Sequence, residues 1–192
     1  YAIWNFLKVI HEKGWLYKGR DSVPWCPRCG TAISQHEILT EEYKELKHQT
    51  VVVKFPIITR GWEKSSLLAW TTTPWTIPGN VALAVDPKLS YVAATAKGGE
   101  RVIFVNSNKV EGKDKKDMFV KKFSLLEGLS KMREVKGKDL VGLEYEGPYD
   151  HFPAVKKALA GYIHRVVATD GQILPINPAE GTGIVHIAPV AG

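Results

Sequence analysis

From residue 51 onward, the sequence consists of short β-prone runs separated by turn-forming residues, and this pattern restricts the fold more than any other feature. Glycine, proline, asparagine or aspartate bounds each run, so the chain must reverse its direction many times. We predict strands at residues 51–55, 67–72, 81–85, 91–96, 101–106, 135–141, 161–168 and 183–188. Many short strands with few helices predict a mainly β domain with some α, in which the strands form a closed or partly closed β-barrel.

The first part of the chain follows a helical pattern instead. Apolar side chains at spacings of three and four predict a helix over residues 3–13, ended by Gly14. The apolar face of this helix consists of Ile3, Phe6, Leu7 and Ile10. A charged stretch at residues 41–48 is predicted to connect two units. We therefore expect a helix with a cysteine knuckle at residues 1–46, which links to the rest of a longer protein, and a β-barrel domain at residues 47–192.

The composition fits a globular chain in water, with 44% hydrophobic and 24% charged residues. No apolar run approaches the roughly 20 residues that a membrane-spanning helix needs, so we expect no membrane partner. The two cysteines are too few for a disulfide framework, which favours a reducing, cytoplasmic location. The net charge of +6 suits an anionic partner such as RNA, and it equally suits a lysine-coated surface without such a partner.

Lysines crowd a polar stretch at residues 109–122, which we predict to be a surface helix or loop, followed by a short helix at residues 125–132. The lysines are Lys109, Lys113, Lys115, Lys116, Lys121 and Lys122. Most such runs are solvated faces, and a salt-sensitive attraction to a tRNA backbone is the alternative. Trp62, Trp70 and Trp75 could stack on a base, but burial among strands is the commoner fate of tryptophan.

The most informative segment is Leu-Leu-Ala-Trp-Thr-Thr-Thr-Pro-Trp-Thr-Ile-Pro-Gly-Asn at residues 67–80. Proline lacks an amide N–H and fixes φ, so the strand cannot continue past Thr73 as a central member of a sheet. At such a strand end, Thr71, Thr72 and Thr73 can present hydroxyls that donate and accept hydrogen bonds, which suits the holding of a water or a ribose hydroxyl. Taken alone, three threonines are better explained by their preference for strands.

A second segment, Gly-Thr-Gly-Ile-Val-His-Ile-Ala-Pro at residues 181–189, places His186 within a β-prone run that Pro189 ends. The glycines allow a turn and the close approach of another backbone. A single histidine in a strand is more often a core residue than a catalytic one. The threonine-rich peptide in the same chain reverses this preference and favours a functional role for His186.

Both segments resemble signatures of the editing domain in the connective-peptide insertion of isoleucyl-tRNA synthetases, which are class I aminoacyl-tRNA synthetases. Relatives specific for valine and leucine usually carry Arg-Pro after the first two threonines, whereas this chain has Thr73-Pro74-Trp75. The resemblance extends to the stretches at residues 14–19 and 23–34. It implies the fold of the Val/Leu/Ile-tRNA synthetase editing domains, and it implies hydrolysis of the aminoacyl ester of mischarged Val-tRNA(Ile).

The resemblance also assigns roles to individual residues. The residues implied to be catalytic are Thr71, Thr72, Thr73, Asn80 and His186. The residues implied to bind substrate are Trp70, Trp75, Gly183, Ile184, Val185 and Ala188. The threonines and the asparagine would hold the terminal adenosine, the ester and the attacking water. His186 would form one wall of the amino-acid subsite and bar the larger, correct side chain.

A second, hydrolytic site makes physical sense for such an enzyme. Valine lacks one methylene of isoleucine, and an apolar pocket separates the two by only about 1–3 kcal/mol, for which isoleucyl-tRNA synthetases are themselves the standard example. Because an aminoacyl ester is already activated, the site needs to position water and stabilise an oxyanion without building a strong nucleophile. Accordingly, the sequence has neither a Gly-x-Ser-x-Gly nor a His-Glu-x-x-His motif.

The implied partners are tRNA(Ile), through its 3′-terminal aminoacyl-adenosine, and the rest of the parent synthetase chain, with the fragment itself monomeric. Editing needs no cofactor. The parent would ligate isoleucine to tRNA with ATP and magnesium, but the ATP-binding signatures of that catalytic core are not in these residues. The family's aspartate that grips the substrate's α-amino group is expected just past Gly192, so we expect residues beyond 192 to complete the pocket.

Cys26-Pro-Arg-Cys29 has the spacing of half a zinc ribbon, and His36 is the nearest further ligand. Some relatives in the family bind zinc around such a knuckle, but without a second cysteine pair we expect no metal here. A redox role would need a βαβ pattern that the sequence lacks. Three alternatives to the editing hydrolase stay open. They are a non-catalytic module that binds the tRNA 3′ end, a zinc-dependent structural appendage, and the editing domain of a valine- or leucine-specific relative.

Overall fold

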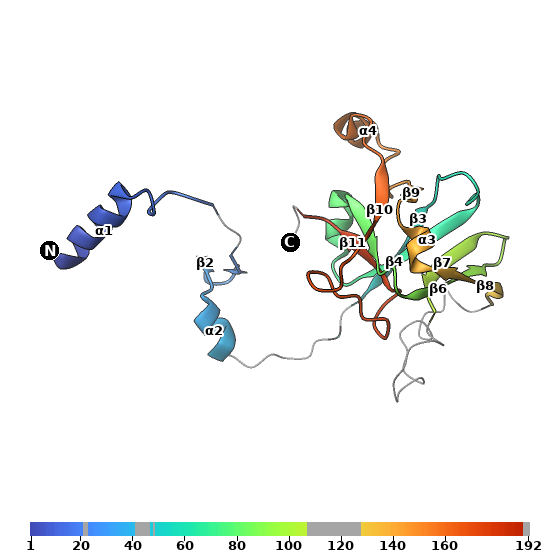
Figure 1. Cartoon of the computed structure of the whole chain (residues 1–192), viewed down its shortest axis with the longest axis horizontal. Coiled ribbons are helices and arrows are strands. Elements are labelled where there is room, and N and C mark those ends of the chain that lie inside the picture. The colour runs from blue at the N-terminus through green and yellow to red at the C-terminus, as the bar shows by residue number, and fades with distance from the viewer. Residues whose placement is uncertain (21–22, 41–46, 48, 107–127, 190–192) are drawn as a thin grey trace. The chain divides into compact units, whose positions relative to one another are not determined.

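The computed structural model describes residues 1–20, 23–40, 47, 49–106 and 128–189. The chain divides into two compact units, Tyr1–Lys47 and His48–Gly192, and Figure 1 labels most of their elements. Within the described ranges, no helix has the length and apolar character needed to cross a membrane. The lysine-rich run, most of the charged connection at residues 41–48 and the last three residues lie outside these ranges.

The first unit contains the predicted N-terminal helix. This helix, α1, spans Ala2–Glu12, as the spacing of its apolar residues predicts. It ends because Gly14 adopts a positive φ of 71°, from which its N–H donates to the carbonyl of His11. The cysteine knuckle is a small hairpin followed by a second helix, with β1 at Trp25–Cys26, β2 at Thr31–Ala32 and α2 at Gln35–Thr40.

The second unit contains a five-stranded mixed sheet in the order β3-β4-β7-β6-β8. β4 and β7 are parallel, and every other neighbouring pair is antiparallel. The strands are β3 (Val51–Pro56), β4 (Ser65–Thr71), β6 (Ser90–Thr95), β7 (Arg101–Val105) and β8 (Ser130–Lys136). Of these, β3, β4, β6 and β7 confirm predicted strands. Short β-prone runs between turn formers specify these strands locally.

A four-stranded mixed sheet follows the order β11-β5-β10-β9. Here β5 and β10 are parallel, and the two outer pairs are antiparallel. The strands are β5 (Ala82–Val85), β9 (Glu144–Tyr145), β10 (His164–Ala168) and β11 (Ile184–Ile187). The helices of this unit are the 3₁₀-helix η1 (Pro74–Gly79), α3 (Gly137–Leu140) and α4 (Pro153–Leu159). The sequence predicts β5, β10 and β11, but it misses β9 and these helices.

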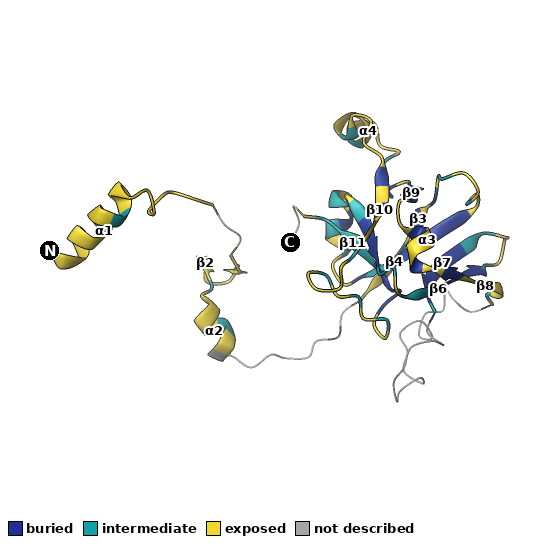
Figure 2. Cartoon of the chain, viewed as in Figure 1, coloured by how far each residue is buried: buried dark blue, intermediate teal, exposed yellow. Residues whose placement is uncertain are grey.

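One hydrophobic cluster joins the two sheets. Leu67 and Leu68 of β4, Leu83 of β5 and Ile103 of β7 are fully buried members of it. Neighbouring residues of a strand point to opposite faces, so the burial of adjacent Leu67 and Leu68 means that both faces of β4 are covered. Burying each such side chain contributes about 1.5–3 kcal/mol. Figure 2 shows the buried residues gathered on the strands of the second unit, whereas α1 and α4 are mostly exposed.

The predicted barrel requires a correction, because the described strands form separate mixed sheets and no closed barrel is found among them. β4 pairs with β7 only over its first three residues, up to Leu67. Further along β7, the N–H of Val105 donates to the carbonyl of Thr182, not to β4. A barrel needs an unbroken ladder around its circumference. The sheets are instead linked by such single contacts, including an isolated bridge between Ile57 and Tyr145.

Two further predictions are wrong near residue 135. β8 occupies the end of the range 125–132 predicted as a helix, and it covers only the first two residues of the range 135–141 predicted as a strand. Pairing with β6 overrides the helical pattern. The strand ends before Gly137, where a Cβ would lie 2.1 Å from the carbonyl oxygen of Asp86. Helix α3 then turns the chain so that Leu140 is fully buried.

Candidate functional site

A cleft opens where β4 ends, beside η1 and β11. Its volume is about 430 Å³, within the usual range for small-molecule sites. It is lined by Trp70, Thr71, Thr72, Thr73, Trp75, Thr76, Val185, His186 and Ala188. The threonine-rich peptide and the histidine strand therefore face the same cleft, although they lie far apart in the sequence.

The local sequence explains why the threonines lie at this edge. β4 ends at Thr71, and Pro74 begins η1, where its missing N–H and fixed φ are tolerated. The 3₁₀ turn leads the chain into β5, which pairs with β11 so that Leu83 lies opposite His186. A short turn between two buried strands thus places the hydroxyls next to the imidazole.

The threonine hydroxyls form a small hydrogen-bonded group. The N–H of Thr73 donates to Thr71 Oγ1 at 3.0 Å, and the Oγ1 atoms of these two residues lie 3.2 Å apart. Thr71 is buried, whereas Thr72 and Thr73 are exposed. Because Thr71 Oγ1 already accepts from an amide, its own hydrogen can go to Thr73 or to a group in the cleft. This arrangement can hold a water or a substrate hydroxyl by both donating and accepting.

His186 is half-buried, and both of its ring nitrogens have partners. Nε2 lies 2.9 Å from Thr76 Oγ1, and Nδ1 lies 3.0 Å from Asn80 Nδ2. The Thr76 hydroxyl also donates to the carbonyl of Thr73 at 2.7 Å. Burial lowers the pKa of His186 below its usual value, because the charged ring loses hydration. The imidazole is therefore neutral near pH 7.

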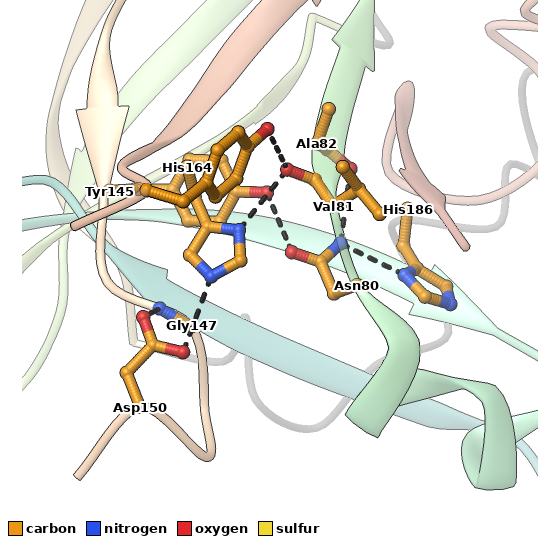
Figure 3. Close-up of polar contacts among 9 residues, drawn as sticks. Asn80, Val81, Ala82, Tyr145, Gly147, Asp150, His164 and His186 are labelled. Atoms are coloured by element: carbon orange, nitrogen blue, oxygen red, sulfur yellow. Dashed lines mark hydrogen bonds and ion pairs between the residues drawn. The ribbon is translucent and has the colours of Figure 1, made fainter. Parts of the chain in front are cut away.

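A buried group of polar side chains lies behind Asn80. The phenol of Tyr145 donates to Asn80 Oδ1 at 2.6 Å, and Figure 3 shows Asn80 between Tyr145 and His186. The ring of His164 stacks on Tyr145, with centroids 5.3 Å apart. His164 Nε2 in turn lies 3.2 Å from Asp150 Oδ1. A continuous set of contacts thus runs from the cleft into the four-stranded sheet.

Most of the residues predicted for the site line this cleft, and three do not. Asn80 holds the histidine from outside the cleft. Gly183 and Ile184 line a smaller cavity of about 180 Å³, which shares Trp70 and Val185 with the cleft. The roles of all these residues stay predictions.

Sequence reasoning misses Thr76 and Tyr145. Thr76 follows Thr73 by one turn of η1, and this spacing is the signal that could have identified it. Tyr145 carries no comparable signal, because it comes from β9, outside both informative segments. Only the pairing of β9 with β10 brings its phenol to Asn80.

The cysteine knuckle belongs to the first unit. The N–H of Cys29 donates to Cys26 Sγ at 3.3 Å, and this contact lowers the pKa of the Cys26 thiol. Two cysteines fill only half of a tetrahedral zinc site. Among the residues that the structure describes, no group of three or more histidine, cysteine, aspartate or glutamate side chains is placed to hold a metal ion. The metal-free state of the knuckle stays a prediction.

A separate hollow of about 290 Å³ lies against the five-stranded sheet. Its charged lining residues are Arg101, Lys131, Arg133, Glu134 and Asp139. Neither the threonine-rich peptide nor the histidine strand contributes to it. The cleft beside β11 is therefore the candidate site.

The chain is similar to known proteins over its whole length. The profile of the family described as tRNA synthetases class I (I, L, M and V) matches residues 1–171. The isoleucine–tRNA ligase of Clostridium novyi is 42% identical over 192 residues, and that of Thermus thermophilus is 42% identical over 194 residues. Each alignment covers 100% of this chain and 16% of the relative, so the chain spans about a sixth of their length.

Among solved structures, the crystal structure of GlLeuRS-CP1 is similar with a TM-score of 0.53 and 19% sequence identity. The alignment covers 73% of this chain and 55% of that chain. At this identity the likeness concerns the fold alone. It agrees with the mainly β architecture with some helix.

Proposed function

Because the chain belongs to the class I tRNA synthetases, in the group of isoleucine, leucine, methionine and valine enzymes, we propose that it is the editing domain of an isoleucine–tRNA ligase and hydrolyses mischarged Val-tRNA(Ile). One observation supports this most strongly. Thr76 Oγ1 and His186 Nε2 are separated by 110 residues in the sequence and lie 2.9 Å apart at the cleft. Ligation of isoleucine by the whole protein, with tRNA(Ile) and the rest of the parent chain as partners, belongs to the same proposal.

The proposed reaction is the attack of a water on the carbonyl carbon of the aminoacyl ester. A bond forms between the water oxygen and that carbon, and the bond from the carbon to the ribose oxygen breaks. The proton lost by the water ends on the ribose oxygen, so the products are valine and tRNA. Thr71 and Thr73 hold the water, and the exposed hydroxyl of Thr72 donates to the developing oxyanion.

Size selection follows from the way His186 is held. Its ring cannot move aside without losing the contacts to Thr76 and Asn80. The extra methylene of isoleucine meets this wall, whereas valine fits. Forcing one extra methylene into a well-packed site costs about 1–3 kcal/mol, which corresponds to a discrimination of roughly 5- to 150-fold.

The test measures the release of labelled amino acid from charged tRNA. The 192-residue chain, and the same chain continued past residue 192 in its natural sequence, are each incubated with Val-tRNA(Ile) and with Ile-tRNA(Ile). We expect the valine ester to be hydrolysed and the isoleucine ester to be spared. A preference for Thr-tRNA(Val) over Val-tRNA(Ile) would instead identify a valine-specific relative.

A binding assay with the same tRNAs separates the hydrolase from a non-catalytic module. If both versions of the chain bind the aminoacylated 3′ end and neither speeds its hydrolysis, the hydrolase proposal is wrong. Raising the salt concentration should weaken binding without changing the preference between the two esters, because phosphate contacts carry no information about the amino acid.

A further inference from the structure

We propose that Tyr145, in the short strand β9, is a positioning residue that holds His186, through Asn80, as a neutral imidazole carrying its proton on Nε2. The proposal rests on the proposed function, since it specifies how the wall of the editing cleft is held. Tyr145 OH lies 2.6 Å from Asn80 Oδ1, and Asn80 Nδ2 lies 3.0 Å from His186 Nδ1. These contacts are drawn in Figure 3.

The orientation of the Asn80 amide follows from one carbonyl group. The amide atom 3.0 Å from the backbone oxygen of Ala82 must be the nitrogen, because a carbonyl oxygen can only accept. The atom at the other end is then Oδ1, which faces the phenol of Tyr145. A carbonyl-type oxygen also accepts only, so Tyr145 is the donor. The contacts with Tyr145 and Ala82 thus require the same orientation of the Asn80 amide.

The protonation of His186 follows from the same amide. Asn80 Nδ2 has two hydrogens, of which one goes to Ala82 and the other to His186 Nδ1. Nδ1 must therefore present a lone pair, and a neutral ring then carries its proton on Nε2. This proton is donated to Thr76 Oγ1 at 2.9 Å. Thr76 can accept it because its own hydrogen goes to the carbonyl of Thr73.

The three hydrogen bonds that link these side chains thus have the same donor-to-acceptor direction, from Tyr145 through Asn80 and His186 to Thr76. A proton on Nδ1 would face a hydrogen of the Asn80 amide, so the ring cannot be protonated unless this contact breaks. The burial that lowers the pKa of His186 acts in the same sense. His186 therefore acts as a wall of the cleft that is held in one orientation, and not as the base that takes the proton of the attacking water.

Tyr145 is suited to this role because its ring is held firmly. It is 1% exposed, and Phe55 packs against it edge-on with centroids 5.4 Å apart. His164 stacks on it at 5.3 Å. Burial raises the pKa of the Tyr145 phenol, so it stays protonated and remains a donor near neutral pH.

The test records the nitrogen chemical shifts of the His186 ring by NMR in the 192-residue chain. His186→Gln identifies the signals. We expect a bare Nδ1 and a protonated Nε2 in the unaltered chain. In Tyr145→Phe the Asn80 amide loses one of its two anchors, so the shifts should move toward those of a mixture of tautomers, and deacylation of Val-tRNA(Ile) should slow about tenfold. Tyr162→Phe is the matched control, since that phenol donates to the neighbouring Val81 carbonyl and not to Asn80.

Two outcomes would overturn the proposal. The first is a proton on Nδ1, or a mixture of tautomers, in the unaltered chain, and this result does not depend on whether any variant folds. The second is a folded Tyr145→Phe chain whose His186 shifts equal those of Tyr162→Phe. The NMR measurement needs no tRNA, so this proposal can fail while Val-tRNA(Ile) is still hydrolysed. Equally, the hydrolase assignment can fail while the tautomer is as stated.

Discussion

On one side of His186 lie threonine hydroxyls at the cleft, whereas on the other side lie Asn80 and two nearly fully buried rings. The cleft side consists of Thr71, Thr72, Thr73 and Thr76, and the support side consists of Asn80, Tyr145 and His164. Thr72 and Thr73 are exposed, while Tyr145 and His164 are 1% and 3% exposed. The difference indicates that chemistry and stability are separable here. Changes on the cleft side should affect hydrolysis, and changes on the support side should affect both folding and hydrolysis.

The largest expected effect is on the support side. Tyr145→Ala removes a fully buried ring from between Phe55 and His164, which should cost about 3–5 kcal/mol of unfolding free energy. Urea unfolding measures it. The matched control is Tyr162→Ala. Tyr162 is 49% exposed, so its replacement should cost clearly less unfolding free energy. Equal losses in the two variants would contradict the distinction between the two sides.

The next effect concerns the wall itself. His186→Ala removes the imidazole and leaves Thr76 and Asn80 with space between them, so isoleucine should enter the cleft. We expect hydrolysis of Ile-tRNA(Ile) to rise about tenfold or more, which is within the range that one methylene can contribute. Deacylation rates with both esters measure the change. A variant that still spares Ile-tRNA(Ile) completely, while it hydrolyses Val-tRNA(Ile), would show that His186 is not the wall.

A smaller pair of changes compares one residue from each side. Thr72→Ala removes an exposed hydroxyl and should alter the unfolding free energy by no more than about 0.5 kcal/mol, yet slow deacylation. Asn80→Ala leaves Tyr145 and His186 without their shared partner and should cost about 1–3 kcal/mol. Thermal unfolding alongside deacylation separates the two variants. If Thr72→Ala destabilises the chain as much as Asn80→Ala, the two sides are not distinct.

The smallest effect is on the pH dependence of stability. The pKa of His186 is lowered by burial, so in the window between its folded value and the ordinary value of about 6.5 the unfolded chain binds more protons. The free energy of unfolding should therefore fall as the pH is lowered through this window. Above the window, where His186 is neutral in both the folded and the unfolded chain, this loss of stability is absent. The effect is small because the ring is only half-buried. Urea unfolding measures the free energy of unfolding of the unaltered chain and of His186→Gln at a series of pH values. The two pH profiles should diverge below about pH 6.5. Parallel profiles would contradict the expected role of His186.

Local pattern was enough to predict some parts of the fold and not others. The runs that became β3, β4, β5, β6 and β7 are short and rich in apolar, β-prone residues between turn formers, and this pattern does not depend on what lies elsewhere. At residues 125–132 the pattern is helical, but the last residues of this range pair with the edge of β6 and form part of β8. The barrel is not formed because the pairing of β4 with β7 ends after Leu67. Such pairing joins strands that are distant in the sequence, so local pattern does not predict it.

The candidate site shows the same division. Thr71, Thr72, Thr73 and His186 lie in two contiguous segments with recognisable composition, so sequence alone names them. Tyr145 belongs to a two-residue strand whose neighbours give no sign of a site. Asn80 is named by the sequence as a residue in contact with the reaction, but the structure places it outside the cleft, as the link between Tyr145 and His186.

The sequence by itself determined the β-rich character of residues 51 onward, the end of β4 at the threonines, and the family to which these segments belong. These properties depend on backbone propensity and on short motifs, which are read over a few neighbouring residues. The tertiary structure alone decided that two mixed sheets form in place of a barrel, and that the phenol of Tyr145 meets the amide of Asn80. Hydrogen-bond direction depends on which donors and acceptors meet in space, and residues 65 positions apart in the chain meet only after the sheets have formed.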